Sequence, residues 1–360
     1  MITVKLTDVC RPKQWKTIPT EQLLTEGYPV YGANGVIGYY SEYNHEESVV
    51  TITCRGATCG SVTLACPKAY ITGNAMCLDE VKANIRIDYL YYCMKHYDFR
   101  NVISGSAQPQ ITRQDLGKVR IQVYSMDKQY EIVTALKRAE GIINLCKQQL
   151  SALDTLVKAR FVEMFGNPVS NPMRWEKAQL QEYLLNIENG KSIVCSNEPR
   201  QGAWPAILKL SAATYGEYRP SENKALLEIT QYIEGVEVHN GDLLFTRKNT
   251  PELVGMAAYV NSTPAKLMMP DLIFRLNTKE RCSKVFLWQL INHKLFRAKI
   301  QNLASGSAKS MSNISKERLL KLEVYMPPIE LQHDFAAFVS QVDKSKLIDA
   351  RKSFSGGVAA

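Results

Sequence analysis

The feature that most constrains the fold of this chain is a long tandem repeat. The tetrapeptide Ser104–Ala107 returns as Ser305–Ala308, and the segment that follows it, Ile111–Ile121, can be aligned with Ile314–Val324. A stretch with helical periodicity comes next in both copies. The repeat spacing of about 200 residues is far longer than the units of roughly 20–50 residues that build solenoids. The sequence therefore predicts one domain and one helix, duplicated in tandem, and two similar modules can address two sites at a fixed separation.

Length and charge narrow the functional class. The chain has 360 residues, a formal net charge of +9 and a sequence pI of about 9.0. A basic balance favours a polyanionic partner, most often nucleic acid. The N-terminus does not have the shape of a signal peptide, and no apolar run reaches membrane-spanning length. We therefore expect a cytoplasmic protein that does not enter a membrane.

The nine cysteines are an odd number and are spread through apolar stretches. This pattern is typical of a reduced intracellular protein that uses cysteine as a small hydrophobic residue. A zinc site has to be considered because Cys54, Cys59, Cys66 and Cys77 lie near one another in the sequence. The chain nevertheless contains no C-x-x-C pair, which zinc-binding arrays generally have. We therefore expect no metal site.

Each module reads as a compact α+β domain. In the first, Asn34-Gly35 lies between the β-like runs Tyr28–Tyr31 and Val36–Tyr40, a pattern that predicts a hairpin. A helix is predicted from Ile87 to about Lys95, and its counterpart in the second module from Val285 to about Ile300. Closely spaced strands with few helices favour a mixed β-sheet domain.

The segment from about residue 129 to 165 has apolar residues at alternating steps of four and three. This narrow stripe predicts a coiled-coil helix rather than a surface helix lying on its own domain. Gly166 and Pro168 should end the helix. The seam residues in the first helix are Ile132, Leu136, Ile143, Leu150, Leu153 and Val157.

A second seam begins with Phe335, Val339 and Val342, but its next two steps fall on Lys346 and Asp349. We therefore expect a shorter second helix, weaker contact at its distal end, and a frayed tail over residues 353–360. The predicted domains are 1–124 and 167–328 for the two modules, with helices over 125–166 and 329–360.

The two-copy layout, the seam helices and several local phrases together resemble one family, the specificity subunits of type I restriction–modification systems. Each phrase alone is weak, but their order and spacing cover nearly the whole chain. The phrases are Val4–Cys10, Tyr28–Gly38, Thr53–Gly60, Thr72–Met76 and Phe161–Gly166 in the first part, and Gly241–Leu244 and Ser305–Ile314 in the second.

The resemblance implies that each module is a target-recognition domain for one half of a split double-stranded DNA sequence. It implies that the long helices pair antiparallel, hold the domains apart and set the spacer between the half-sites. Two methyltransferase subunits would dock on the helices and domains, and restriction/motor subunits would join them. Such a subunit has no catalysis and no cofactor of its own; it directs partners that methylate adenine or cleave DNA.

The sequence lacks the motifs of the enzymes that we considered, in agreement with a protein that has no catalytic activity. An adenine methyltransferase would need a nucleotide-binding glycine loop and an Asn/Asp-Pro-Pro-aromatic segment, and Met326–Ile329 has the wrong flanks for the latter. No Walker glycine loop and no Gly-x-Ser-x-Gly elbow occur. We therefore expect a protein that is not an enzyme.

Arginine, asparagine and glutamine read base edges, whereas lysine and small polar residues contact phosphates. In the first module Arg55 lies in a loop next to a glycine. Asn34 and Asn74 are also next to glycines, and an alternative interpretation is that they only form left-handed turns. Lysines are common on solvated faces, so each is a weaker candidate. The candidates for DNA contact are Asn34, Arg55, Lys68, Asn74, Gln108 and Gln110 in the first module, and Lys191, Lys209, Arg247, Lys248 and Lys309 in the second.

Two other functions remain open at this point. A helical scaffold that does not bind DNA would explain the seam but not the paired modules. A self-sufficient DNA nuclease would need clustered carboxylates and lysines for a metal, and only scattered carboxylates are present. The two modules differ enough in sequence that the two DNA half-sites should not form a palindrome.

Overall fold

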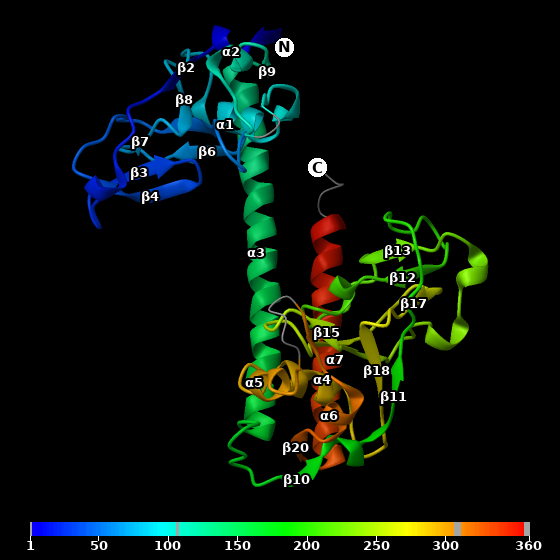
Figure 1. Cartoon of the computed structure of the whole chain (residues 1–360). Coiled ribbons are helices and arrows are strands. Elements are labelled where there is room, and N and C mark those ends of the chain that lie inside the picture. Colours follow the sequence, from blue (N-terminus) through cyan, green and yellow to red (C-terminus); the bar gives the residue numbers. More distant parts are fainter. Residues whose placement is uncertain (1, 106–107, 306–310, 356–360) are drawn as a thin grey trace. The chain divides into compact units, whose positions relative to one another are not determined.

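The computed structural model describes residues 2–105, 108–305 and 311–355, with side chains up to Lys346. The chain divides into two compact units, Met1–Asn144 and Leu145–Ala360, and the long helix α3 (Met126–Phe165) contributes to both. Each unit is an α+β domain with its own cores (Figure 1). In the part of the chain that the structure describes, no helix is both long and apolar enough to cross a membrane.

The first unit has a central four-stranded antiparallel sheet in the order β2-β8-β5-β6. A second sheet, β4-β3-β7, contains the predicted hairpin, and β1 pairs with β9. Every residue of β5 is buried, because apolar clusters cover both faces of this strand. The strands are β1 (Ile2–Lys5), β2 (Arg11–Gln14), β3 (Tyr28–Gly32), β4 (Gly35–Tyr40), β5 (Val49–Thr53), β6 (Val62–Ala65), β7 (Tyr70–Ile71), β8 (Ala75–Asp79) and β9 (Arg120–Val123).

The second unit repeats this topology strand for strand. Its sheets have the orders β11-β18-β14-β16, β13-β12-β17 and β10-β20, with the same parallel pairing inside the three-stranded sheet. A short additional pair, β15-β19, follows the central strand. The strands are β10 (Glu176–Gln179), β11 (Leu184–Asn189), β12 (Ala206–Leu208), β13 (Asn223–Ala225), β14 (Leu243–Thr246), β15 (Lys248–Asn249), β16 (Ala257–Tyr259), β17 (Leu267–Met268), β18 (Ile273–Thr278), β19 (Ser312–Asn313) and β20 (Glu323–Met326).

The short helices are duplicated as well. Helix α1 (Ile87–Lys95) corresponds to α4 (Lys284–Asn292), and α2 (Arg113–Leu116) corresponds to α6 (Lys316–Leu320). The prediction of one helix from Val285 to about Ile300 is wrong, because the segment is divided between α4 and α5 (Arg297–Gln301).

The division of that predicted helix has a local cause. His293 has an extended backbone (φ −63°, ψ 128°), and its Nδ1 accepts a hydrogen bond of 3.3 Å from the amide of Leu295. This turn directs the side chain of Phe296 into the core, where it is fully buried. In a continuous helix the same side chain would point in a different direction. Burial of one aromatic side chain thus outweighs the helical periodicity of the sequence.

The first turns of helix α3 pack on the short helix α1 of the first unit rather than on a second long helix. Val133 is buried against Tyr89 and Tyr92 of α1, and the predicted seam residues Ile132 and Leu136 line the same cluster. At its other end the helix stops at Phe165, and Gly166 adopts a left-handed φ of +74°.

Within the second unit, the last part of α3 pairs with helix α7 (Ile329–Ser355) (Figure 1). The rings of Phe161 and Phe335 lie 5.6 Å apart, and Asp154 Oδ1 lies 2.7 Å from Lys346 Nζ. Residue numbers rise along one helix as they fall along the other, so the two helices are antiparallel. The predicted seam residues Leu153, Val157, Phe335, Val339 and Val342 all belong to this core.

The helix contact does not break at Lys346 as the sequence suggested. The ammonium group of Lys346 bridges Asp154 on the partner helix and Asp343 on its own, at 2.7 and 3.3 Å. Helix α7 continues to Ser355, three residues into the predicted frayed tail, and residues 356–360 lie outside the described part of the chain. At 27 residues it is shorter than the 40-residue α3.

Two predicted seam residues, Ile143 and Leu150, belong neither to the cluster around α1 nor to the core between α3 and α7. Ile143 and Leu150 are 53% and 37% exposed. The first lies beyond the last turn of α3 that packs on α1. The second precedes the turns that pack on α7, as far as the side chains of α7 are described. Their predicted role in docking a partner subunit stays a prediction.

One buried glutamine ties each long helix to its own domain. Gln129 Oε1 accepts a hydrogen bond from the backbone amide of Arg86, the residue that caps α1, at 2.9 Å. Its Nε2 donates to the carbonyls of Asn84 and Tyr124 at 2.8 and 2.9 Å. Both Gln129 and Gln332 are fully buried.

Gln332 of α7 makes the same three bonds in the second unit. Its Oε1 accepts from the amide of Ser283, the cap of α4, at 2.8 Å. Its Nε2 donates to Pro327 and Arg281 carbonyls at 2.8 and 3.4 Å. We call these two residues the glutamine clamps. Sequence reasoning placed both at helix starts but did not identify their role, since a polar residue at a helix start is ordinarily solvated.

Candidate nucleic-acid interface

Most first-module candidates gather at one end of the central strand β5. Directly after this strand, Arg55 forms a β-bridge with Gln110, and the amide of Gly56 donates to the carbonyl of Pro109 at 3.2 Å. The Gln110 backbone is held by paired hydrogen bonds with Ser104, at 2.8 and 2.9 Å. The side chains of Arg55, Gln108 and Gln110 are exposed. The strand end therefore presents a cation and two amides to solvent.

Asn34 and Asn74 join the same strand end. Asn34, in the β3–β4 turn, accepts a hydrogen bond of 2.6 Å on its Oδ1 from the Thr58 hydroxyl, and Asn74 accepts the Cys54 amide on its carbonyl at 3.3 Å. Neither asparagine has a positive φ; the left-handed position of the hairpin turn is Gly35, at φ +95°. Both asparagine side chains are exposed, so turn geometry does not account for them.

Lys68 lies apart from this group. It follows β6, whose last residue Ala65 pairs with Val49, the first residue of β5. Lys68 is therefore at the opposite end of the sheet, where its ammonium group lies 4.0 Å from a carboxylate oxygen of Glu46. Lys68 therefore lies away from the other five candidates, because the strand pairing reverses the chain direction between them, and its predicted contact with DNA stays a prediction.

In the second module the corresponding strand end is built from Arg247, Lys248 and Asn313. Lys248 pairs with Asn313 as Arg55 does with Gln110, and Asn313 is tied to Ser305 by hydrogen bonds of 2.9 and 3.1 Å. The repeated serine segment thus begins a loop that returns to the central strand in both modules, although residues 106–107 and 306–310 lie outside the described chain.

The two strand ends differ in how they use their cations. The Arg247 guanidinium lies 4.9 Å above the Phe274 ring, and its Nε and Nη2 each lie 3.3 Å from Asn313 Oδ1. This arginine is half-buried and internally bonded, whereas Arg55 is exposed. Lys248, also half-buried, stands in the place of Arg55.

The other second-module candidates have different surroundings. Lys191 is exposed and forms a bridge with Pro270, in the same segment whose Leu272 carbonyl accepts the Arg247 amide, so it lies at this strand end. Lys209 follows β12, and its ammonium group lies 3.9 Å from a carboxylate oxygen of Glu222. Lys309 lies outside the described residues.

Cys54 occupies the position of Arg247 in the first module. Its carbonyl accepts the Ile111 amide at 3.0 Å, as the Arg247 carbonyl accepts the Ile314 amide at 2.8 Å. Burial raises the pKa of the Cys54 thiol, and Gln14 Nε2 donates to its sulfur at 3.0 Å. A protonated, hydrogen-bonded thiol at this place is structural rather than nucleophilic.

The duplicated topology, the antiparallel helix pair and the paired strand ends prompt a comparison with known proteins. The family described as the type I restriction modification DNA specificity domain matches residues 1–155 and 172–353. The chain belongs to this family. The match covers both modules and most of both long helices, in agreement with the resemblance seen in the sequence.

Individual relatives agree with the family. The chain is 32% identical over 196 residues to the specificity subunit of the type I restriction enzyme EcoEI of Escherichia coli, a match that covers 52% of this chain and 33% of the relative. It is 29% identical over 117 residues to the EcoprrI specificity subunit of the same species, covering 32% of this chain and 29% of the relative. The matched segments thus span about a third of these curated relatives.

Solved structures support the same fold. The S subunit of a type I restriction–modification system from M. genitalium superposes with a TM-score of 0.62 at 13% identity, covering 98% of this chain and 92% of that one. A chain from a study of complex assembly and conformational transition of the type I R-M system superposes with a TM-score of 0.53 at 15% identity, covering 98% and 94%. At these identities the likeness is one of fold.

Proposed function

We propose that this chain is a DNA sequence-recognition subunit of a type I restriction–modification complex and has no catalytic activity of its own. Each domain reads one half of a bipartite target. The observation that carries the proposal is the duplicated strand end, where a loop begun by the same serine segment places polar and cationic side chains beside the central strand of each domain.

The chemistry of the two strand ends suits DNA. An exposed arginine can bond guanine with two donors, and an amide can bond adenine in the same way. Arg55 and Gln110 have these properties in the first domain, with Asn34, Asn74 and Gln108 around them. In the second domain Lys248 and Lys191 are suited to phosphates, and Arg247 lies beside them. Because the two ends differ, we propose two unlike half-sites.

The helices have the second role in this proposal. Helix α3 has 40 residues, or about 60 Å at 1.5 Å per residue, enough to set a spacer between half-sites. Two methyltransferase subunits would dock on the helices, where Ile143 and Leu150 leave apolar surface exposed, and restriction/motor subunits would join them. The complex would act on double-stranded DNA in the cytoplasm. The curated relatives are specificity subunits of type I restriction enzymes, which supports these assignments.

A methylome tests the proposal. The chain is expressed with its neighbouring methyltransferase subunit in a host without other adenine methylation, and modified bases are read by long-read sequencing. We expect a single split, non-palindromic motif with a fixed gap, methylated on both strands. The variant Arg55→Ala should lose or relax one half of the motif, whereas Lys68→Ala, at the opposite end of the same sheet, should leave it unchanged.

Two results would contradict the proposal. A stable complex of the two subunits without any methylated motif would argue against sequence reading by this chain. Absence of a complex, together with failure to bind heparin in a salt-dependent manner, would instead favour a helical scaffold that does not bind DNA.

A further inference from the structure

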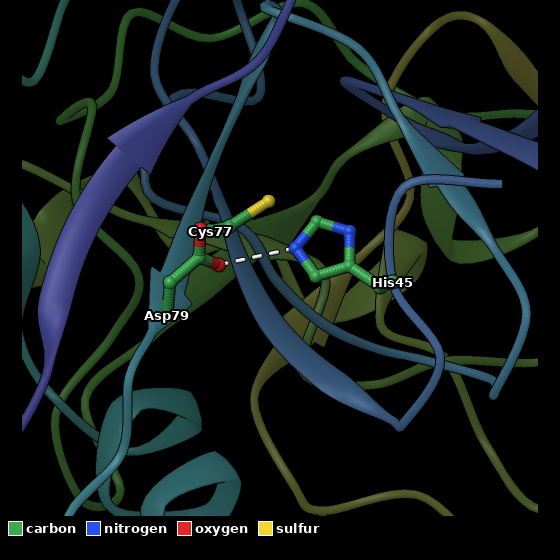
Figure 2. Close-up of side chains that lie close together, drawn as sticks. All are labelled: His45, Cys77 and Asp79. Atoms are coloured by element: carbon green, nitrogen blue, oxygen red, sulfur yellow. Dashed lines mark hydrogen bonds and ion pairs between the residues drawn. The ribbon is translucent and has the colours of Figure 1, made fainter.

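A cluster of metal-binding side chains lies inside the first domain, away from the strand end described above. His45, Cys77 and Asp79 each offer one possible ligand atom, and these atoms lie within 4.8 Å of one another (Figure 2). His45 Nε2 is 3.1 Å from Asp79 Oδ1. Among the residues that the structure describes, no other group of three or more His, Cys, Asp or Glu side chains meets in this way.

The cluster is buried and connects different parts of the domain. Cys77 and Asp79 are two residues apart on β8, so both point to the face of the central sheet opposite Met76 and Leu78. His45 comes from the segment between β4 and β5. Cys77 is fully buried, and the side chains of His45 and Asp79 are only 10% and 12% exposed.

Hydrogen bonds determine where the histidine proton must be. The Asn44 side chain is oriented by Ile71, whose amide donates to Oδ1 at 2.9 Å and whose carbonyl accepts from Nδ2 at 3.0 Å. Asn44 Oδ1 lies 2.6 Å from His45 Nδ1, so Nδ1 must carry the proton that this acceptor needs. Nε2, on the other side of the ring, is then the nitrogen that faces the Asp79 carboxylate and the one that a metal ion could bind.

The second domain has a cation of its own at the matching place. Strand pairing aligns Cys77 of β8 with Arg275 of β18. Arg275 is buried, its Nη1 donates to Glu188 at 2.9 Å, and its Nε lies 3.0 Å from Asp242 Oδ2, although not in a hydrogen-bonding direction. A guanidinium thus lies beside the buried carboxylate of Asp242 and the half-buried one of Glu188, and the first domain has the Cys77 thiol at this position.

We propose that His45 Nε2, Cys77 Sγ and Asp79 Oδ1 bind a zinc ion, with a water molecule as fourth ligand. A mixed nitrogen, sulfur and oxygen set is one that zinc accepts, and its bond lengths of about 2.0–2.3 Å require ligand atoms roughly 3.3–3.7 Å apart. The Nε2–Oδ1 distance of 3.1 Å is already close to this, so the thiolate has to approach by about 1 Å at most.

The surrounding groups are those that support a metal ligand. Asn44 Oδ1 accepts the Nδ1 proton of His45, and Trp15 Nε1 donates to Asp79 Oδ2 at 3.0 Å, which orients both ligands. Burial raises the pKa of the Cys77 thiol, so zinc binding would release the thiol proton to solvent. The ion with its thiolate and carboxylate then carries no net charge, which suits a buried place.

Such an ion would join two sheets of the recognition domain. Asn44 pairs with β7 of the three-stranded sheet, and the neighbouring His45 would be tied to β8 of the four-stranded sheet. The ligands are buried and lie apart from the loop that carries Arg55, so the ion would stabilise the domain rather than contact DNA. We expect the ion to hold the β3–β4 hairpin, which carries Asn34, against the central sheet.

The test is made on the purified full-length chain. Its zinc content is measured by inductively coupled plasma mass spectrometry after dialysis against metal-free buffer, and about one zinc per chain is expected. Cobalt replacement should give a thiolate-to-cobalt absorption band, which requires the Cys77 thiolate and should be absent from Cys77→Ser. Cys77→Ser and Asp79→Asn should lose the ion, whereas Cys66→Ser, at an exposed cysteine of the same domain, should retain it.

Wild-type protein without zinc, without a cobalt–thiolate band and without a rise in melting temperature on adding zinc would overturn the proposal. The cluster would then be only the hydrogen-bonded pair of His45 and Asp79. Zinc that remains bound in Cys77→Ser, with its folding verified by circular dichroism, would equally overturn it, since the ion would lie elsewhere.

Discussion

The two domains share the strand orders of their three main sheets but differ in the polar and charged side chains at their strand ends and in their interiors. Both have the same sheet orders and the same glutamine clamp. The first domain exposes Arg55 at its strand end, whereas in the second domain Arg247 lies over the ring of Phe274. The interior of the first domain has the cluster of His45, Cys77 and Asp79, and the interior of the second has Arg275 at the position of Cys77. Duplication has preserved the backbone contacts that position each domain, and the side chains facing solvent or an interior polar site have diverged.

The clamps are the strongest test of the shared part. Replacing Gln129 or Gln332 with leucine leaves one amide and two carbonyls unpaired in a buried place, and each such group costs roughly 1–3 kcal/mol. We expect each substitution to lower the free energy of unfolding by about 3 kcal/mol, with similar values for the two sites. Urea titration followed by circular dichroism measures the change.

Gln148→Leu is the matched control, since this glutamine is exposed on the same helix as Gln129. It should leave stability nearly unaltered. A loss at Gln332 of less than a third of that at Gln129 would show that the duplicated bonds are not energetically equivalent.

The next prediction concerns the divergent part. If Arg55 bonds a base, Arg55→Ala should weaken binding of the methylome-defined target by roughly 10- to 100-fold and relax specificity at one position. Lys248→Ala should weaken binding less, act evenly across sequences and reduce the salt slope by about 1, as for a lost phosphate contact. Fluorescence anisotropy of the assembled complex at several salt concentrations separates the two.

Lys68→Ala serves as the control for both variants, because Lys68 faces Glu46 at the opposite end of the sheet. An effect of Lys248→Ala that exceeds that of Arg55→Ala and depends on sequence would reverse the assigned roles of the two domains.

The interhelical ion pair allows a smaller test. Lys346→Ala leaves Asp154 and Asp343 without their shared cation, and a partly exposed pair of this kind contributes about 1 kcal/mol or less. A double-mutant cycle with Asp154→Ala should give a coupling free energy of that size. Zero coupling would support the original expectation that helix contact is weak beyond Val342.

How far the sequence predicted this structure depends on the kind of contact. The repeat, the hairpin, helix α1 and both long helices follow from periodicity and turn residues, which act locally. The separation of Lys68 from the other candidates could not be predicted, because its neighbours in space are set by antiparallel strand pairing and not by distance along the chain. The cluster around His45 was missed because Asn44 and His45 meet Cys77 and Asp79 only in the folded domain, with no regular spacing between them.

The prediction of smallest effect uses the two histidines that end the corresponding helices α1 and α4. His96 is exposed, whereas His293 is packed against Phe161 and accepts the Leu295 amide on Nδ1, which requires an unprotonated nitrogen. Burial lowers the pKa of His293 below its ordinary value of about 6.5. Protonation therefore favours the unfolded chain. The stability contributed by the neutral ring is complete above about pH 6.5 and declines as the pH falls toward the lower folded-state pKa.

His293→Phe, which cannot titrate and retains an aromatic ring, should flatten the decline in unfolding free energy between about pH 7 and pH 5. His96→Phe should leave that decline as it is in the wild type, because the same helix position in the first domain faces solvent. Urea titrations at the two pH values measure both variants. If His96→Phe flattened the curve instead, the acid sensitivity would belong to the first domain, and the burial of His293 would have no bearing on it.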